Sequence, residues 1–242
     1  INIDKNFKFD LSNLKNEKYD LLVLTHPFGF YLDVENINKV LDGKKKIIFD
    51  SSHSQGIEIE GKDHMKFADI SFMSLQGNKA ISGGEGGVIF TDNEHSYLQM
   101  INNHHPGHKK NIKLKVAGGI NDLKLRMHPL AAILAKYDLK KFENRNKELT
   151  KKIKLMYDYL DNLGIQHPYN ENSKIGGFHF GIPFFSKKNL SSKYIKKYNW
   201  YENLRSLEIK SASSESDVTF FKELYFFDLE WIKRENISNL KK

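Results

Sequence analysis

One lysine lies inside the most glycine-rich part of the chain, in the stretch SLQGNKAISGGEGG at residues 74–87. The hydrophobic segment ADISFMS leads into this stretch and VIFT follows it, so Lys79 lies between two predicted buried strands. A lysine amine that loses its proton can attack a carbonyl group and bind it covalently. Glycines let the backbone approach a flat or phosphorylated ligand, because they carry no side chain. The stretch therefore suggests covalent chemistry at Lys79.

An aspartate at the end of another predicted strand supplies a second chemical group. Asp50 closes the apolar segment KIIFD, and His26 and Ser74 also end predicted strands. Ligands of parallel α/β sheets bind at the carboxyl ends of the strands, where these side chains would meet. A buried carboxylate needs a cationic partner, and the protonated ring nitrogen of pyridoxal phosphate is one. Asp50 and Lys79 could be the two poles of such a site, although each alone is more often a turn or surface residue.

The elements that must position these residues follow from hydrophobic periodicity. Apolar runs predict strands at residues 19–26, 46–50, 68–74 and 86–91. Helices are expected at 33–43, at 94–103 and, with a kink or break near 140–146, at 129–163. This alternation predicts a mostly parallel α/β sheet. Beyond it we expect a smaller α/β unit, with a strand at 176–185 and helical stretches within 191–200 and 216–242.

Composition excludes several classes of protein. The 242 residues are 39% hydrophobic and contain no apolar run long enough to cross a bilayer. No signal peptide pattern is present, so we expect a cytoplasmic protein without a membrane partner. The absence of cysteine excludes disulfides and thiolate chemistry. The net charge of +8 suits a phosphate-bearing substrate, whereas the scattered lysines form no stripe interleaved with aromatic residues and predict no nucleic-acid binding.

Taken together, the motifs resemble the core of the DegT/DnrJ/EryC1/StrS aminotransferases, which are sugar aminotransferases with the aspartate aminotransferase-like fold. The segments DSSHSQG, ADISFMSLQGNK and GGEGGVIFT occur in the family's order, and GGINDLKLRMHPLAA at 118–132 is similar to the segment before its interdomain helix. The resemblance covers nearly the whole chain. It implies the remainder of a large α/β domain of pyridoxal phosphate fold type I at 1–128, an interdomain helix region at 129–163 and a small C-terminal α/β domain at 164–242.

The resemblance also implies a role for each matching residue. Lys79 would bind the cofactor covalently and then carry protons during transfer of the amino group. Asp50 would pair with the pyridine nitrogen, His53 would lie near the ring or its 3′-oxygen, and Ser74 would donate to the phosphate. Asn121 would reach the phosphate of the cofactor in the other subunit, because family members form homodimers with shared active sites.

The activity implied is transfer of an amino group from an amino acid, expected to be glutamate, to a keto sugar linked to a nucleotide diphosphate. One alternative is a sugar dehydratase of the same fold, in which the lysine is often replaced. Another is a non-catalytic basic fragment, and a third is an enzyme that uses GGEGG as a nucleotide-phosphate loop.

Two further expectations concern metals and the start of the chain. His104, His105 and His108 could bring two imidazoles to a cation, but no carboxylate adjoins them and a Pro-Gly pair breaks any helix there, so no metal site is predicted. The chain opens without Met in what reads as mid-domain sequence. The phosphate-binding turn and stacking aromatic of the family would precede Ile1, so we expect an N-terminal part to be missing.

Overall fold

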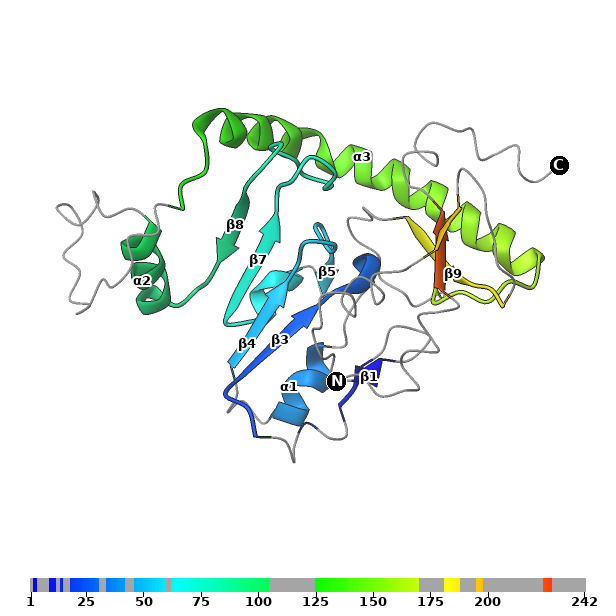
Figure 1. Cartoon of the computed structure of the whole chain (residues 1–242), viewed down its shortest axis with the longest axis horizontal. Helices are drawn as coiled ribbons and strands as arrows, with labels where there is room; N and C mark the ends of the chain where they lie inside the picture. Colours follow the sequence, from blue (N-terminus) through cyan, green and yellow to red (C-terminus); the bar gives the residue numbers. More distant parts are fainter. Residues whose placement is uncertain are drawn as a thin grey trace.

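The computed structural model describes residues 2–3, 9–11, 14, 18–30, 34–41, 46–59, 62–104, 125–169, 181–187, 195–197 and 224–227. Three residues singled out in the sequence, Asn121, His105 and His108, lie outside these ranges. A long helix, α3 (Pro129–Asn162), passes the larger sheet and continues to a smaller one (Figure 1). Among the described helices, none combines the length and the apolar character needed to cross a membrane.

The larger sheet is mostly parallel, as predicted. Its strands are β3 (Leu21–Thr25), β4 (Lys46–Asp50), β7 (Ile70–Ser74) and β8 (Gly87–Phe90). They lie side by side in that order, with β3, β4 and β7 parallel and β8 antiparallel to β7. Each coincides with a strand predicted from an apolar run. The carboxyl ends of β4 and β7 therefore bring Asp50 and Ser74 to the same edge of the sheet.

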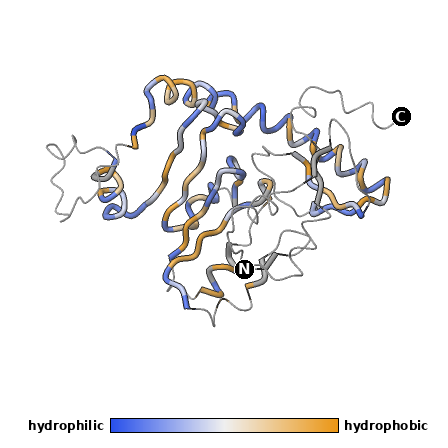
Figure 2. Tube along the Cα trace, viewed as in Figure 1, coloured by the Kyte–Doolittle hydropathy of each residue, from blue (hydrophilic) through white to orange (hydrophobic). Residues whose placement is uncertain are grey.

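One face of this sheet carries the core. Leu22 and Leu24 are buried while Leu21 and Val23 are exposed, since neighbouring residues of a strand point to opposite faces. Helix α1 (Val34–Leu41) contributes Ile37 to the buried cluster, and Figure 2 shows the apolar character of β3 and β4. Helix α2 (Glu94–His104) follows β8. The short elements are β1 (Asn2–Ile3), β2 (Phe9–Asp10), η1 (Pro27–Gly29), β5 (Glu58–Ile59), β6 (Lys62–Asp63) and η2 (His64–Phe67).

Helix α3 is continuous. It begins at Pro129, where the Nδ1 atom of His128 accepts a hydrogen bond from the backbone N–H of Leu130 at 3.2 Å. The predicted break near residues 140–146 is therefore wrong. Phe142 in this segment packs against the cluster around Leu75, so tertiary contact supports the helix where the sequence pattern weakens.

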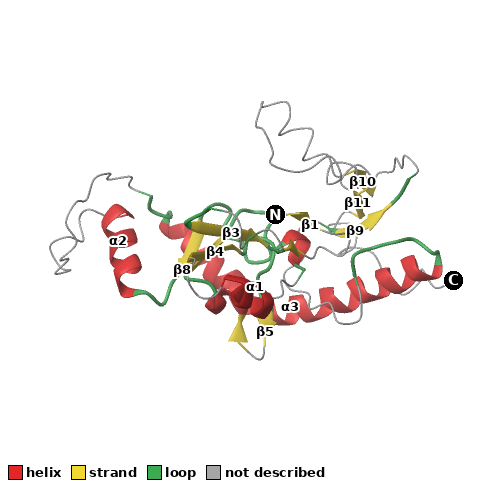
Figure 3. Ribbon diagram, turned by 90° about the horizontal axis from the view of Figure 1, so that it is seen from below, coloured by secondary structure: helices red, strands yellow, loops and turns green. Residues whose placement is uncertain are grey.

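The smaller sheet consists of β9 (Ile182–Phe185), β10 (Ile195–Lys197) and β11 (Leu224–Phe227), all antiparallel in the order β10-β11-β9. It lies beside the second half of α3 in both Figure 1 and Figure 3. The helical stretches predicted within 191–200 and 216–242 are therefore wrong where β10 and β11 occur. β9 is buried along its whole length, and β11 pairs with it. This pairing favours the extended conformation for the residues LYFF of β11, which are good strand formers.

Candidate active site

Lys79 lies in a compact turn, the lysine turn (residues 75–83), which connects β7 to the glycine run. The backbone N–H of Gly83 donates to the carbonyl of Leu75 at 2.8 Å, and that of Lys79 donates to the carbonyl of Gln76 at 3.0 Å. Leu75 and Ile81 are buried against Ala135 of α3. The turn is thus folded on itself and anchored by its apolar residues, so the position of Lys79 is fixed locally.

Two of the glycines near Lys79 have structural reasons that do not involve a ligand. A Cβ atom on Gly83 would lie 2.6 Å from the backbone oxygen of Ala131, closer than real Cβ atoms approach. Gly86 has a φ of +124° and lies against Met127, where a Cβ would be 3.0 Å from the side chain. The sequence suggested that glycines let a ligand approach. The structure instead shows that the backbone of α3 leaves no room for a side chain at 83, whereas at 86 the positive φ favours glycine.

Asp50 lies close enough to Lys79 and His53 to influence the ionisation of both, and Lys79 influences that of His53. Burial lowers the pKa of the Lys79 amine, and the nearby Asp50 carboxylate opposes this effect without cancelling it. Burial also lowers the pKa of His53 to about 4, helped by the positive charge of Lys79 and opposed by Asp50. The cluster therefore contains a half-buried amine that loses its proton more readily than an ordinary lysine, beside a carboxylate and a neutral imidazole.

Hydrogen bonds through Asp50, Ser52 and Ser74 connect the ends of β4 and β7 beside this cluster. Asp50 accepts a hydrogen bond from the backbone N–H of Ser52 at 3.0 Å, and the Ser52 hydroxyl accepts one from the backbone N–H of Ser74 at 3.1 Å. The Ser74 hydroxyl accepts from the backbone N–H of Gln76 at 3.2 Å, so it lies at the start of the lysine turn. Ser74 is therefore close to the site by its backbone connections, as predicted for a residue at a strand end.

A buried glutamine connects the loop that follows Asp50 (residues 51–57, the Asp50 loop) to both sides of the lysine turn. The side-chain amide of Gln55 donates to the carbonyl of Ser74 at 2.9 Å, and its oxygen accepts from the backbone N–H of Ile81 at 2.8 Å. Gln55 is only 1% exposed, so both bonds are protected from water. The sequence analysis missed this residue, although an amide inside the segment DSSHSQG next to a glycine was a visible signal of a side chain that holds a loop.

His64 contacts the Asp50 loop through both of its ring nitrogens. Its Nδ1 atom is 3.1 Å from the carbonyl oxygen of Ile57, so Nδ1 carries the proton, and Nε2 is 2.9 Å from the hydroxyls of both Ser51 and Ser54. Nε2 then carries a single lone pair, which accepts a hydrogen bond from a serine hydroxyl. His26, also predicted at a strand end, is buried with its ring edge-to-face with His64, and it belongs to the packing below the site.

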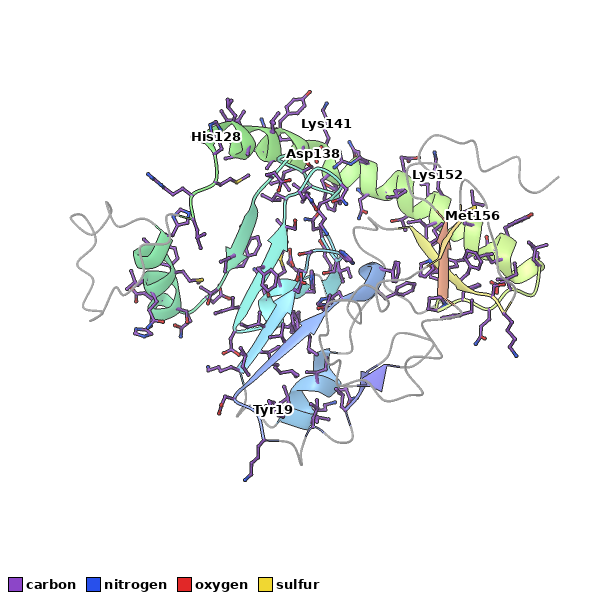
Figure 4. All side chains as sticks on the ribbon, in the orientation of Figure 1. Tyr19, His128, Asp138, Lys141, Lys152 and Met156 are labelled. Carbon is purple, nitrogen blue, oxygen red and sulfur yellow. The ribbon has the colours of Figure 1, made fainter. Side chains whose placement is uncertain are left out.

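A cavity of about 420 Å³ lies between the lysine turn and α3. Its lining combines Lys79, Ala80, Ser82, Gly77 and Gly84 with Leu134, Tyr137, Asp138, Phe142, Arg145, Asn146 and Leu149 of the helix. Figure 4 shows Asp138 where α3 passes the connection between β7 and β8. The helix thus forms one wall of the space beside the reactive amine.

A family model describes most of the chain. The DegT/DnrJ/EryC1/StrS aminotransferase family matches residues 10–199, which include the Asp50 loop, the lysine turn and α3. The chain belongs to this family. The resemblance noted in the sequence motifs is therefore confirmed, and members of the family depend on pyridoxal phosphate.

Curated relatives of this family member match a limited part of it. The GDP-perosamine synthase of Vibrio cholerae is 28% identical over 86 residues, which are 35% of this chain and 23% of that protein. The GDP-perosamine synthase of Escherichia coli O157:H7 is 29% identical over 93 residues, which are 38% of this chain and 26% of that protein. The matched segments therefore span about a quarter of the length of these relatives.

Solved structures share the fold over the whole chain. An E. coli GDP-4-keto-6-deoxy-D-mannose-3-dehydratase with bound hydrated pyridoxal phosphate has a TM-score of 0.69 at 19% identity, covering 100% of this chain and 73% of that one. AtS13 from Actinomadura melliaura has a TM-score of 0.74 at 12% identity, covering 100% of this chain and 72% of that one. The predicted pyridoxal phosphate fold type I is confirmed.

The lowered pKa of His53 predicts a dependence of stability on pH. His53 binds a proton at about pH 4 in the folded chain and near its ordinary value of 6.5 when unfolded. Between these values the unfolded chain binds more protons, so the free energy of unfolding should fall as the pH drops from about 6.5 to about 4. NMR titration of the cofactor-free chain should give a His53 midpoint near 4.

Denaturant unfolding at both ends of this range tests the contribution of His53. The variant His53→Gln should lose less stability on acidification than the wild type, whereas His95→Gln, which alters an exposed histidine, should not. Burial lowers the pKa of His26 as well, so part of the decrease should remain in His53→Gln. A His53 midpoint near 6.5 would contradict the buried, neutral imidazole.

Proposed function

We propose that this protein is a pyridoxal phosphate-dependent aminotransferase that moves an amino group from an amino acid, expected to be glutamate, to a keto sugar linked to a nucleotide diphosphate. The observation that carries this proposal is the pair of Lys79, an amine with a lowered pKa, and Asp50 in a member of the DegT/DnrJ/EryC1/StrS family. An amine that loses its proton readily and a carboxylate beside it are the two groups that this chemistry demands.

The residues present fit the cofactor. The Asp50 carboxylate can accept a hydrogen bond from a protonated ring nitrogen, and Ser74 offers a hydroxyl at the end of the neighbouring strand. When bound, pyridoxal phosphate supplies an electron sink for the carbon that carries the amino group. His53, which is neutral near pH 7, can contact the ring without adding a positive charge. Asn121 remains a proposed contact from the second subunit.

Lys79 performs two tasks in this proposal. Its uncharged amine is the nucleophile toward a carbonyl, and burial raises the population of that form. With the cofactor bound, the same amine would also carry the proton that moves during transfer of the amino group, for which a pKa closer to the working pH is favourable. Asp50 limits how far the pKa of the amine falls, because its negative charge stabilises the protonated form.

The identity of the acceptor is tested by a direct assay. The curated relatives are named GDP-perosamine synthases, which supports a GDP-linked keto sugar as the first acceptor to try. The purified natural polypeptide is incubated with pyridoxal phosphate, glutamate and this sugar, and the products are identified by mass spectrometry. An aminated nucleotide sugar that forms together with 2-oxoglutarate supports the proposal, whereas no aminated product from any nucleotide-linked keto sugar contradicts it.

A sugar dehydratase is the second candidate, because a solved structure of similar fold is a 3-dehydratase. Loss of water from the sugar, with no nitrogen gained, would identify this activity in the same assay. Lys79 favours amino transfer, since the dehydratases of this fold often replace that lysine.

We also propose that the protein forms a homodimer through the first half of α3. Large apolar side chains of this region are exposed, including Ile133 at 63% and Tyr137 at 60%. Leu134 and Tyr137 also line the cavity beside Lys79, so a second subunit on this surface would lie next to the site. Replacing Ile133 with aspartate should convert the dimer to a monomer in analytical ultracentrifugation, because a charge cannot be buried there without a partner.

The control for this prediction is Lys154→Asp, which places the same charge on an exposed position of the second half of α3. It should leave the dimer intact. A wild-type protein that sediments as an active monomer would contradict the homodimer.

A further inference from the structure

Two charged residues of α3 form an ion pair directly above the lysine turn. Asp138 and Arg145 are seven positions apart and therefore lie on the same face of the helix. The guanidinium of Arg145 binds both carboxylate oxygens of Asp138, with Nη1 to Oδ1 at 2.6 Å and Nη2 to Oδ2 at 3.0 Å. This two-bond geometry fixes both side chains relative to each other.

Each member of this pair also holds a backbone group of the lysine turn. The Oδ2 atom of Asp138 accepts from the backbone N–H of Ser82 at 2.9 Å, and Arg145 donates to the carbonyl oxygen of Ala80. The negative side chain thus meets a peptide donor and the positive side chain meets a peptide acceptor. These two peptide groups follow Lys79 directly, so the ion pair limits their movement.

The opposite side of the same turn is held by Gln55, which binds the backbone on both flanks of Lys79. The turn is therefore clamped between a loop that carries Asp50 and a helix that carries Asp138 and Arg145. Lys79 lies between the backbone groups that these contacts hold, at Ser74 on one side and at residues 80–82 on the other.

We propose that Asp138 and Arg145 position Lys79, by fixing the backbone that follows it so that its amine stays beside Asp50 and His53. This inference deepens the proposed function and rests on it. The pair is partly exposed, with 24% and 41% of the two side chains accessible, and partly exposed ion pairs add little to global stability. Its main effect should therefore be local, on the surroundings of the amine.

The first readout is the ionisation of Lys79 in the cofactor-free natural polypeptide. Acetic anhydride modifies uncharged amines, and peptide mass spectrometry over a pH series gives a midpoint for each lysine. In wild type the midpoint of Lys79 should lie below those of exposed lysines, consistent with the direction of its pKa. In Asp138→Ala and Arg145→Ala it should rise toward them, because a released turn exposes the amine to water.

The second readout is the rate at which pyridoxal phosphate becomes fixed to Lys79 by borohydride. This rate should fall roughly tenfold in both variants, since loss of positioning slows a reaction between held groups. The double variant Glu143→Ala, Lys147→Ala removes an exposed ion pair of the same helix and should change neither readout.

Exchanging the two charged residues tests whether their contacts with the lysine turn matter, or only their ion pair within α3. The double variant Asp138→Arg, Arg145→Asp can restore the ion pair, but it places a donor opposite the N–H of Ser82 and an acceptor opposite the carbonyl of Ala80. It should behave like the single alanine variants. Full recovery of the midpoint and rate in this variant would overturn the inference.

Thermal unfolding shows which variants are folded, and Asp138→Asn replaces Asp138→Ala if the latter does not fold. Asparagine keeps an oxygen for Ser82 and loses the charge for Arg145, so a smaller shift in the same direction is expected. If folded variants have the Lys79 midpoint and the labelling rate of wild type, the positioning role is overturned and the proposed function is not. A wild-type chain that forms no adduct with pyridoxal phosphate would instead overturn the proposed function.

Discussion

Replacing Lys79 with alanine should abolish amino-group transfer while the chain remains folded. The expected loss is at least about 10³-fold in kcat, because one side chain serves as both nucleophile and proton carrier. The lysine turn should persist, since hydrogen bonds from its own backbone, Gln55, Asp138 and Arg145 hold it, together with its apolar anchors. Steady-state kinetics and thermal unfolding measure the two effects.

The matched control is Lys154→Ala, which removes an exposed lysine from the second half of α3 and should retain wild-type activity. Wild-type turnover by Lys79→Ala would refute the assignment of the reactive amine. A melting temperature far below that of wild type would show that the side chain supports the fold, contrary to its position beside a cavity.

Replacing Asp50 with asparagine should have the second largest effect. The amide oxygen can still accept from the backbone N–H of Ser52, so the loop geometry is kept and only the charge is removed. A neutral amide no longer stabilises a protonated ring nitrogen, and kcat should fall by roughly 10²- to 10³-fold, as for loss of a positioned electrostatic group.

The same variant has a readout that needs no turnover. The charge of Asp50 raises the pKa values of Lys79 and His53 against the lowering caused by burial. Both values should therefore fall further in Asp50→Asn, as measured by amine modification and by NMR titration of the cofactor-free chain. An unchanged kcat, or a midpoint of Lys79 that rises, would contradict the proposed pairing.

The location of the site could be predicted from local sequence. Asp50 and Ser74 end apolar runs that fold as neighbouring parallel strands, so their shared edge followed from strand order alone. Lys79 followed from its place between two strands. The start of α3 at His128-Pro129 also followed from local rules, because proline suits the first turn of a helix.

The supports of the site could not be predicted in this way. Gln55 acts on residues that lie 19 and 26 positions further along the chain, and Asp138 acts on a turn 56 positions earlier. Such contacts depend on how α3 passes the sheet, which periodicity does not specify. For the same reason, the sequence attributed Gly83 to the approach of a ligand, whereas the structure shows the backbone of α3 in that place.

The small sheet shows a different limit of local rules. The segments at β10 and β11 lie within stretches that carry helical patterns, yet they fold as strands because β9 is buried and is paired along its length by β11. Tertiary pairing overrides a weak local preference in these segments.

The most direct test of the central claim is to locate the cofactor on the chain. The natural polypeptide is mixed with pyridoxal phosphate, its visible absorbance is recorded, borohydride is added, and the labelled peptide is sequenced by mass spectrometry. The account predicts an absorbance band that borohydride abolishes and a label on Lys79 alone. A folded protein that acquires no label, or acquires it on a different lysine, would contradict the account.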